Sequence, residues 1–251
     1  MKSKDLKLLR KKMAVANKLS LEKDLLQQLL QSKTLSANVL SCWKTQQQEK
    51  QQQRETEEGQ SSSSSSSSSS SFTLFYSPSQ RLSPDQIQQC LGLFQDNMSK
   101  LYQDSSWGLN LDEKRDEFLH SNARFLILQS ETTTTTTTPQ QQEPSSSSLA
   151  AFVHFRFEYD DEESPTCAVL YVYEIQVQQQ YRGQGIGKRL MEIVHTMGRS
   201  QNMSKVVLTV FQSNVNAMRF YRDTLGYTID DTSPSRFGQP EDYEILSLSL
   251  P

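Results

Sequence analysis

A segment punctuated by glycines carries the clearest chemical signal in the chain. It reads Arg182-Gly-Gln-Gly-Ile-Gly-Lys188 and follows an apolar run over 170–177 after a short polar turn. Glycines at 183, 185 and 187 carry no Cβ, so the backbone N–H groups around them are open to a ligand. If the segment opens a helix, these groups form an anion site suited to a pyrophosphate. An ordinary surface turn before a helix would give the same pattern, so the segment alone leaves both interpretations open.

Two motifs in this order resemble those of the GCN5-related N-acetyltransferases. The spacing Arg-x-x-Gly-x-Gly at 182–187 is similar to the acetyl-CoA pyrophosphate loop of that superfamily. Asn214-x-x-Ala-x-x-Phe-Tyr221, which ends in Leu-Gly-Tyr at 225–227, is similar to its Asn-x-x-Ala-x-x-Phe-Tyr helix. The apolar stretch 205–211 lies between them and is typical of a buried strand. The resemblance implies the fold of that superfamily, with acetyl-CoA as the cosubstrate.

Further stretches resemble one branch of the superfamily, the D-type N-terminal acetyltransferases, which acetylate the α-amine of histone tails. Two of them, Leu101-Tyr-x-x-Ser-x-Trp-Gly108 and Ile229-Asp-Asp-x-Ser-Pro-Ser235, belong to no general acetyltransferase pattern. The others lie at 98–102, 113–115, 154–157, 171–174, 205–211 and 243–246, and more loosely at 13–18. Apart from a threonine- and serine-rich insert, the resemblance covers roughly residues 72–250.

Matched position by position, the resemblance implies two sets of binding residues. The coenzyme contacts fall on Ile175, Gln176, Val177, Arg182, Gly183, Gln184, Gly185, Ile186, Gly187, Lys188 and Asn214. The substrate contacts fall on Tyr102, Trp107, Glu158, Tyr173, Glu174, Thr209, Thr232 and Tyr243. Two of these depart from the branch: it has Asp where this chain has Glu158, which reaches one methylene further, and Ser where this chain has Thr232.

The candidate catalytic residues are Glu174, Tyr173 and, as the resemblance implies, Tyr221. An α-amine with a pKa of ~7.7–8.0 is partly neutral near pH 7.4, whereas a lysine amine at ~10.4 is almost entirely protonated, so a modest base suffices for N-termini. Glu174 ends an apolar run, where burial raises the pKa of a carboxyl, and is the candidate base, directly or through one water. The alternative for Glu174 is a structural pair with a nearby Lys or Arg. Tyr221 would protonate the leaving sulfur, and its alternative is a core aromatic on a helix.

Aromatic and acidic side chains would set the specificity. The aromatics would wall a narrow slot that admits a small first residue such as Ser followed by Gly; they are Tyr102, Trp107, Tyr173 and Tyr243. Taken singly, each also fits an ordinary core position. The carboxylates available to an arginine in the third position are Asp230, Asp231, Glu158 and Glu241. The aspartate pair also fits a plain turn before Ser-Pro-Ser.

The predicted function is therefore acetylation of the N-terminal amine of Ser-Gly-Arg-Gly tails of histone four and histone two-A type. We expect a monomeric enzyme of nucleus and cytoplasm that uses acetyl-CoA, no metal, no membrane and no nucleic acid. Two alternatives stay open: the same fold acting on lysine or on another N-terminus, and a non-catalytic module that binds acyl-CoA or histones. A peptide panel in which the acetyl group is located by mass separates them.

The composition of the 251-residue chain is consistent with this prediction. Three scattered cysteines, Cys42, Cys90 and Cys167, fit reduced intracellular thiols and indicate no metal site. No apolar run approaches ~20 residues, so no membrane span is expected, and no signal peptide is recognisable. The net charge is −3. Because residues 1–30 contribute a balance of +5, the remainder is acidic, which favours a cationic partner over nucleic acid.

The elements that must position these residues form a predicted α/β (α+β) fold, a mixed, mostly antiparallel twisted sheet of about seven strands flanked by helices. Residues 1–30 are predicted to be a basic amphipathic helix that packs on the domain or serves as a targeting arm. Residues 31–71 are predicted to be a disordered Gln/Ser linker, and 72–251 the catalytic domain with a disordered loop at 131–148. Strands are predicted at 72–76, 124–129, 149–157, 168–177, 205–211, 227–230 and 241–249, and helices at 3–30, 84–102, 112–120, 185–201 and 214–225.

Overall fold

The computed structural model describes residues 71–131, 147–160, 167–239 and 241–251 of the chain. The described residues fall into two units. One consists of Leu74–Leu128 and Leu149–Pro251 and holds all the site residues discussed below, and the other includes 71–73, 129–131 and 147–148. The predicted N-terminal helix, the Gln/Ser linker and most of the threonine-rich loop lie outside the described residues.

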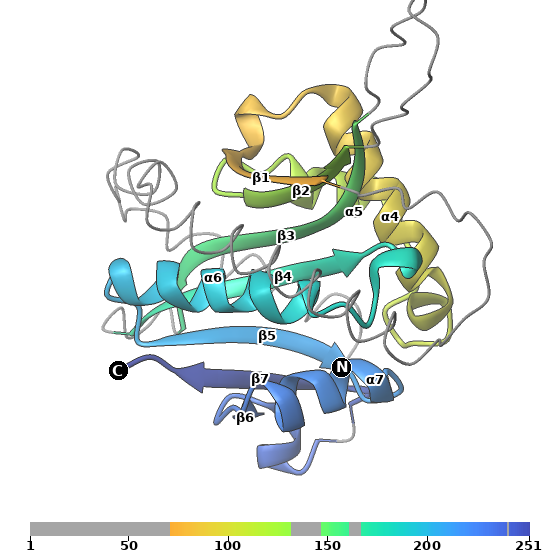
Figure 1. Cartoon of the computed structure of the whole chain (residues 1–251). Coiled ribbons are helices and arrows are strands. Elements are labelled where there is room, and N and C mark those ends of the chain that lie inside the picture. Colours follow the sequence, from red (N-terminus) through yellow and green to blue (C-terminus); the bar gives the residue numbers. More distant parts are fainter. Residues whose placement is uncertain (1–70, 132–146, 161–166, 240) are drawn as a thin grey trace, which may run out of the picture. The chain divides into compact units, whose positions relative to one another are not determined.

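Among the described residues, seven strands form one mixed sheet in the order β1-β2-β3-β4-β5-β7-β6 (Figure 1). Strand β4 runs parallel to β5, whereas β3 and β4, β5 and β7, and β6 and β7 are antiparallel. The strands are β1 Ser71–Pro78, β2 Arg124–Glu131, β3 Ser147–Tyr159, β4 Ala168–Val177, β5 Lys205–Phe211, β6 Thr228–Ile229 and β7 Tyr243–Ser249. The predicted fold class is confirmed.

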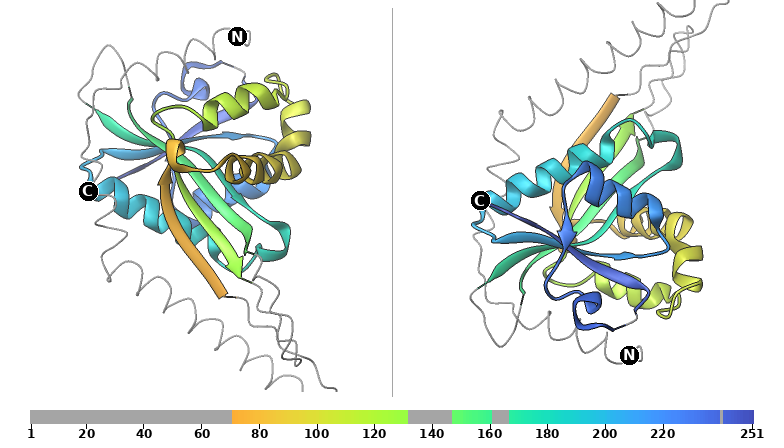
Figure 2. Two further views of the ribbon diagram at one scale, coloured as in Figure 1. Left: turned by 90° about the horizontal axis from the view of Figure 1, so that it is seen from above. Right: turned by 90° about the horizontal axis from the view of Figure 1, so that it is seen from below.

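Within the described ranges, two helices cover each face of the sheet. Figure 2 shows α4 (Pro84–Gln103) and α5 (Leu111–Phe118) on one face, and α6 (Ile186–Ser200) and α7 (Val215–Arg219) on the other. The predicted capping box opens α4, because Ser83 N donates to Gln86 Oε1 at 2.9 Å and Gln86 N donates to Ser83 Oγ at 3.2 Å. We call the face of the sheet that carries α4 and α5 the α4/α5 face.

The last helix differs from the prediction of one α-helix over 214–225. Only Val215–Arg219 is α-helical, and Phe220–Thr224 forms a π-helical turn. The wider turn is closed by Leu225 N, which donates to Phe220 O five residues earlier at 3.2 Å. Turns of this kind are frequent at functional sites, because the extra residue changes the direction of the side chains.

Aromatic packing holds α4 and α5 against the sheet. Phe94 of α4 meets Phe118 of α5 edge to face at 6.5 Å between ring centroids, and Phe118 meets Phe125 of β2 at 5.5 Å. On the opposite face α6 approaches the sheet closely at Gly198, where a Cβ would lie 2.5 Å from Leu250 Cδ1. Both faces are therefore tightly packed, which fixes the strands between them.

The strands β4 and β5 pair along only half of their length. Their register runs from Val169–Lys205 to Val172–Leu208 and stops there. Each strand keeps its other neighbour further along: β4 pairs with β3 up to Val177, and β5 pairs with β7 up to Phe211. The two strands therefore separate beyond Val172 and open a gap in the middle of the sheet.

Within the part of the chain that the structure describes, no helix is long and apolar enough to cross a membrane. The same residues contain no group of three or more His, Cys, Asp or Glu side chains placed to hold a metal ion. Two of the three cysteines are described, and both are free thiols. Burial raises the pKa of Cys90 to about 12, so this thiol stays protonated at neutral pH.

Candidate active site

A cavity of about 910 Å³ surrounds the gap between β4 and β5. Its walls include residues of α4 and α5, of the separated strand ends, and of α6 and the π-helical turn. Because these helices lie on opposite faces of the sheet, the cavity has walls on both faces. All the predicted catalytic residues, coenzyme contacts and substrate contacts line this cavity except Gln184 and Glu158, and the further predicted carboxylates Asp230, Asp231 and Glu241 do not line it. Their individual roles stay predictions.

The glycine segment forms the N-terminus of α6, as predicted. Gly185 is the N-cap residue with φ 80°, and Gly183 has φ 74°, both in the left-handed region that glycine tolerates best. No side chain caps α6, so the N–H groups of its first turn have no intrahelical partner. Gly187 allows a close approach, since a Cβ there would lie 3.4 Å from Phe220 Cζ. The arrangement is suited to an anion, and all three glycines line the cavity.

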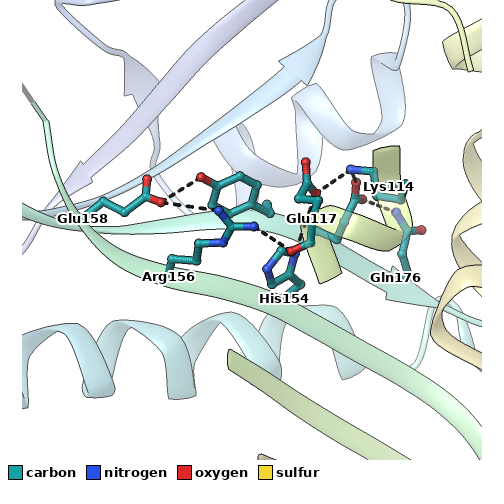
Figure 3. Close-up of polar contacts among 8 residues, drawn as sticks. Lys114, Glu117, His154, Arg156, Glu158 and Gln176 are labelled. Atoms are coloured by element: carbon teal, nitrogen blue, oxygen red, sulfur yellow. Dashed lines mark hydrogen bonds and ion pairs between the residues drawn. The ribbon is translucent and has the colours of Figure 1, made fainter. Parts of the chain in front are cut away.

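Glu174 on β4 is buried, with 6% of its surface exposed, and both of its carboxylate oxygens accept hydrogen bonds. Lys114 Nζ on α5 donates to Glu174 Oε1 at 2.8 Å, and Gln176 Nε2 donates to Glu174 Oε2 at 2.8 Å (Figure 3). Burial raises the pKa of Glu174 above its usual value, while the Lys114 ammonium acts in the opposite direction. The structure therefore has the ion pair that was the alternative interpretation of Glu174, and its role as the base stays a prediction.

Lys114 was missed as a site residue from the sequence. It lies in the charged stretch Leu111–Phe118, which is typical of a solvated helix, yet only 5% of its surface is exposed. Its ammonium also donates to Glu117 Oε1 at 2.7 Å and lies 4.8 Å from the Phe94 ring centroid. The signal that could have revealed it is its spacing of four residues from the core residue Phe118, which places both on one side of α5.

Tyr173 is fixed by charged neighbours on β3. Its hydroxyl donates to Glu158 Oε1 at 2.8 Å, the Arg156 guanidinium lies 4.3 Å from its ring centroid, and the His154 ring stacks on it at 4.9 Å. Burial raises the pKa of Glu158 to about 7, although Arg156 and the Tyr173 hydroxyl lower it. Glu158 was predicted to contact the substrate, but it lies outside the cavity lining and contacts the Tyr173 hydroxyl instead.

Three of the four rings of the predicted aromatic slot form an edge-to-face cluster, and the fourth, Tyr173, lies instead beside Tyr171 and His154. Trp107 lies 6.0 Å from Tyr102 and 5.2 Å from Tyr243, measured between ring centroids. A further ring, Phe211 at the end of β5, lies 5.0 Å from Trp107 and 5.1 Å from Tyr102. The four clustered rings line the cavity, and all four also pack in or against the core of the α4/α5 face. The rings therefore occupy core positions, and their role as a substrate slot stays a prediction.

Asp230, one of the carboxylates expected to bind an arginine of the substrate, is hydrogen-bonded within the protein. Asp230 Oδ2 accepts a hydrogen bond from Lys205 at 2.8 Å, and its Oδ1 accepts from the backbone and hydroxyl of Thr232. Burial alone would raise the pKa of Asp230, but these bonds lower it to about 2. This carboxylate is already committed within the protein, which corrects the expectation. Asp160, which the sequence did not single out, pairs with the same Lys205 and lines the cavity.

Tyr221 lies in the π-helical turn, lines the cavity and is 8% exposed. Burial and then the nearby Glu174 carboxylate raise its pKa above the usual value, so its hydroxyl stays protonated at neutral pH. Asn214 precedes α7 and caps it, because Ala217 N donates to Asn214 Oδ1 at 3.2 Å. The hydroxyl of Thr209 forms a hydrogen bond with Tyr171, another cavity residue.

The separated strands, the uncapped glycine turn and the cavity together form a candidate site with walls on both faces of an α/β sheet. The sequence profile of the Acetyltransferase (GNAT) family matches residues 92–227, more than half of the chain. The chain belongs to this family.

The matches to individual proteins are either short or low in sequence identity. Over 74 residues the chain is 39% identical to N-alpha-acetyltransferase 40 of Saccharomyces cerevisiae, a match that covers 27% of this chain and 26% of that protein. The chain thus spans about a quarter of the length of that curated relative. A GNAT-family acetyltransferase structure from Desulfovibrio desulfuricans has a TM-score of 0.47 at 14% identity, over 72% of this chain and 100% of its own. Arabidopsis thaliana NAA60 in complex with a bisubstrate analogue has a TM-score of 0.47 at 15% identity, over 71% of this chain and 100% of its own.

Proposed function

We propose that the chain transfers the acetyl group of acetyl-CoA to the N-terminal amine of a protein, and that its substrates are Ser-Gly-Arg-Gly tails of histone four and histone two-A type. The observation that carries the proposal is the cavity with walls on both faces of the sheet. A coenzyme that enters from the α6 side and a peptide that enters from the α4/α5 side would meet in the gap between β4 and β5. The similarity to N-alpha-acetyltransferase 40, although partial, supports the same reaction.

The coenzyme side offers an anion site and open backbone groups. The first turn of α6 presents N–H groups to a pyrophosphate, and Lys188 adds an exposed positive charge there. The backbone of 173–177 is no longer paired with β5, so it is available to the pantetheine arm and to the thioester carbonyl. Asn214 lies at the start of α7, on the same side of the sheet.

The peptide side is narrow and aromatic. Tyr102, Trp107, Phe211 and Tyr243 leave room for a small first residue, because large rings at centroid distances of 5.0–6.0 Å fill the space beside the gap. Asp160 lines the cavity and pairs with Lys205 through one oxygen, so a positively charged residue further along the tail would share this carboxylate with Lys205. An α-amine at the tip of a tail fits such a slot better than an amine that belongs to a folded surface.

When bound, acetyl-CoA supplies the thioester carbonyl that the amine attacks. The α-amine needs little help, because at pH 7.4 roughly a fifth to a third of it is already neutral. Glu174, held by Lys114 and Gln176, is the carboxylate that would receive the proton of the amine, directly or through one water. Tyr221 keeps its proton in the free protein and would give it to the departing sulfur. The strands themselves orient both reactants, so the chemistry depends mainly on positioning.

The test is an acetylation assay with a Ser-Gly-Arg-Gly-Lys peptide, read by mass, with the acetyl group located in the sequence. We expect one acetyl group on the α-amine, and no product from the same peptide with a blocked α-amine. Acetylation of the lysine in the blocked peptide would refute the α-amine assignment. A matched peptide with alanine in the third position tests the charged contact, and equal KM values for the two peptides would remove the histone-type specificity from the proposal.

A further inference from the structure

Three segments that are distant in the sequence meet at the side chain of Asn97 on α4. Asn97 Nδ2 donates to Gln176 Oε1 at 2.9 Å and to the backbone oxygen of Val177 at 3.3 Å. Asn97 Oδ1 accepts a hydrogen bond from Arg182 Nη2. Arg182 Nε also donates to the Val177 oxygen, at 3.1 Å. One amide thus joins the helix on the peptide side, the end of β4 and the first residue of the glycine segment.

These contacts belong to a chain of hydrogen bonds with a fixed direction. Arg182 can only donate, and the ionised carboxylate of Glu174 can only accept. Between them Arg182 donates to Asn97, Asn97 donates to Gln176, and Gln176 donates to Glu174 Oε2 at 2.8 Å. Reversing either amide would place two acceptors or two donors against each other. The orientation of the Gln176 amide beside Glu174 therefore depends on Asn97.

We propose that Asn97 is a positioning residue of the acetyl transfer, an inference that rests on the function proposed above. Asn97 orients the Gln176 amide whose N–H donates to Glu174. Its bonds with Arg182 and with the Val177 oxygen hold the start of the coenzyme segment in place. Neither the sequence motifs nor the similar proteins assign Asn97 a role. Gln176 and Glu174 are buried, with 5% and 6% of their surfaces exposed, and Asn97 is half-buried, so this end of the chain of bonds is sheltered from water, which strengthens its bonds, whereas Arg182 is exposed.

Two variants of Asn97 test the proposal in the full chain. Asn97→Asp keeps the shape but replaces the donor by an acceptor, so Gln176 loses its partner and a second carboxylate comes close to Glu174. Asn97→Ala removes both bonding groups in the middle of α4, where alanine has the higher helix propensity, so the variant keeps its fold. The control is Asp96→Asn, the reverse exchange at the exposed neighbouring position on the same helix.

The decisive readout is the titration midpoint of the Glu174 carboxyl, followed by 13C NMR without coenzyme or peptide and assigned with Glu174→Gln. Other groups that act on this carboxyl are Lys114 and Glu117 on α5, His154 opposite it on β3, and Tyr221 in the π-helical turn, and all are unchanged in the variants. We expect the midpoint to rise by about one pH unit in Asn97→Asp, by less in Asn97→Ala and not at all in Asp96→Asn. A residue that served stability alone would lower the melting temperature and leave the midpoint unchanged.

Steady-state kinetics provide the second readout. We expect kcat with the free-amine peptide to fall roughly tenfold in both Asn97 variants, because both lose the donor to Gln176. We expect the KM for acetyl-CoA to rise in Asn97→Ala, because Arg182 then also loses its acceptor. Folded Asn97 variants with the midpoint and the KM of the original protein would overturn the inference. If the original protein acetylates no peptide at all, the proposed function fails, and the titration midpoint still decides the role of Asn97.

Discussion

Replacing Lys114 by methionine tests the charge arrangement under the cavity. The Lys114 ammonium lies 2.8 Å from Glu174 and 2.7 Å from Glu117, and each of the three side chains is at most 9% exposed. Methionine keeps the unbranched stem but leaves the buried carboxylates without this ammonium. Removing one partner of a buried pair costs about 3–5 kcal/mol. A domain of this size loses roughly 2–4 °C of melting temperature per kcal/mol, so we expect a decrease of roughly 6–20 °C at pH 8.

The stability that Lys114→Met loses should depend on pH in a definite direction. Burial already raises the pKa of Glu174 with Lys114 present, and removal of the ammonium raises it further. A carboxyl whose pKa is higher in the folded state contributes stability below its unfolded pKa and loses it as the pH rises through the folded pKa. The deficit of Lys114→Met is therefore largest at pH 8 and smaller at pH 5.

Urea denaturation at pH 5 and pH 8 measures this deficit. The double variant Lys114→Met with Glu174→Gln should recover much of the stability at pH 8, because the buried charge is gone. The matched control is Lys100→Met, which breaks a pair with Asp104 whose lysine is 87% exposed, and should cost less than about 0.5 kcal/mol. A deficit of Lys114→Met below about 1 kcal/mol, or one that is equal at both pH values, would refute the reasoning.

Three further predictions follow from the site. Tyr221→Phe should lower kcat about 10²-fold at unchanged KM, and an unchanged kcat in a steady-state assay would make Tyr221 a core aromatic. Gly185→Ala places a side chain at φ 80°, so it should lower the free energy of unfolding by about 1–2 kcal/mol in urea denaturation and weaken acetyl-CoA binding in calorimetry. The control is Gly92→Ala in α4, where a Cβ would meet nothing within 4 Å, and this variant should stabilise the protein. Glu158→Gln should be more stable than the original protein by about 3 kcal/mol at pH 8 and by about 1 kcal/mol at pH 5, because the Glu158 pKa of about 7 exceeds its usual 4.5. An equal gain at both pH values would contradict this.

Local signals explain why most elements were predictable. Ser83 and Gln86 form the capping box that fixes the start of α4, and Gly185 takes the left-handed conformation that starts α6. Apolar runs such as 168–177 and 205–211 reappear as β4 and β5 with the predicted bounds. Each of these features depends on residues a few positions apart, so the information lies within one short window of sequence.

The contacts between distant segments were not predictable in this way. Lys114 meets Glu174 across 60 positions, and Asn97 meets Gln176 across 79. In the sequence, Lys114 is one charge among many in a polar stretch, and Asn97 is an unremarked polar residue between the core positions of α4. Only the packing of α4 and α5 against β4 makes these side chains partners. The same holds for Asp230, which the fold commits to Lys205.

A single irregularity in β4 explains why two neighbouring residues can both serve the peptide side. In a regular strand, successive side chains point to opposite faces, so Tyr173 and Glu174 would be separated by the sheet. The register between β3 and β4 shifts at this point, because His154 pairs with Glu174 while the next residue of β3 pairs with Val172. Tyr173 is thus the extra residue of a β-bulge. As a result the Tyr173 ring stacks on His154 while Glu174 bonds Lys114 of α5, so both side chains lie on the α4/α5 face. The bulge lies where the pairing of β4 with β5 ends, so it brings the candidate base and an aromatic wall to the gap together.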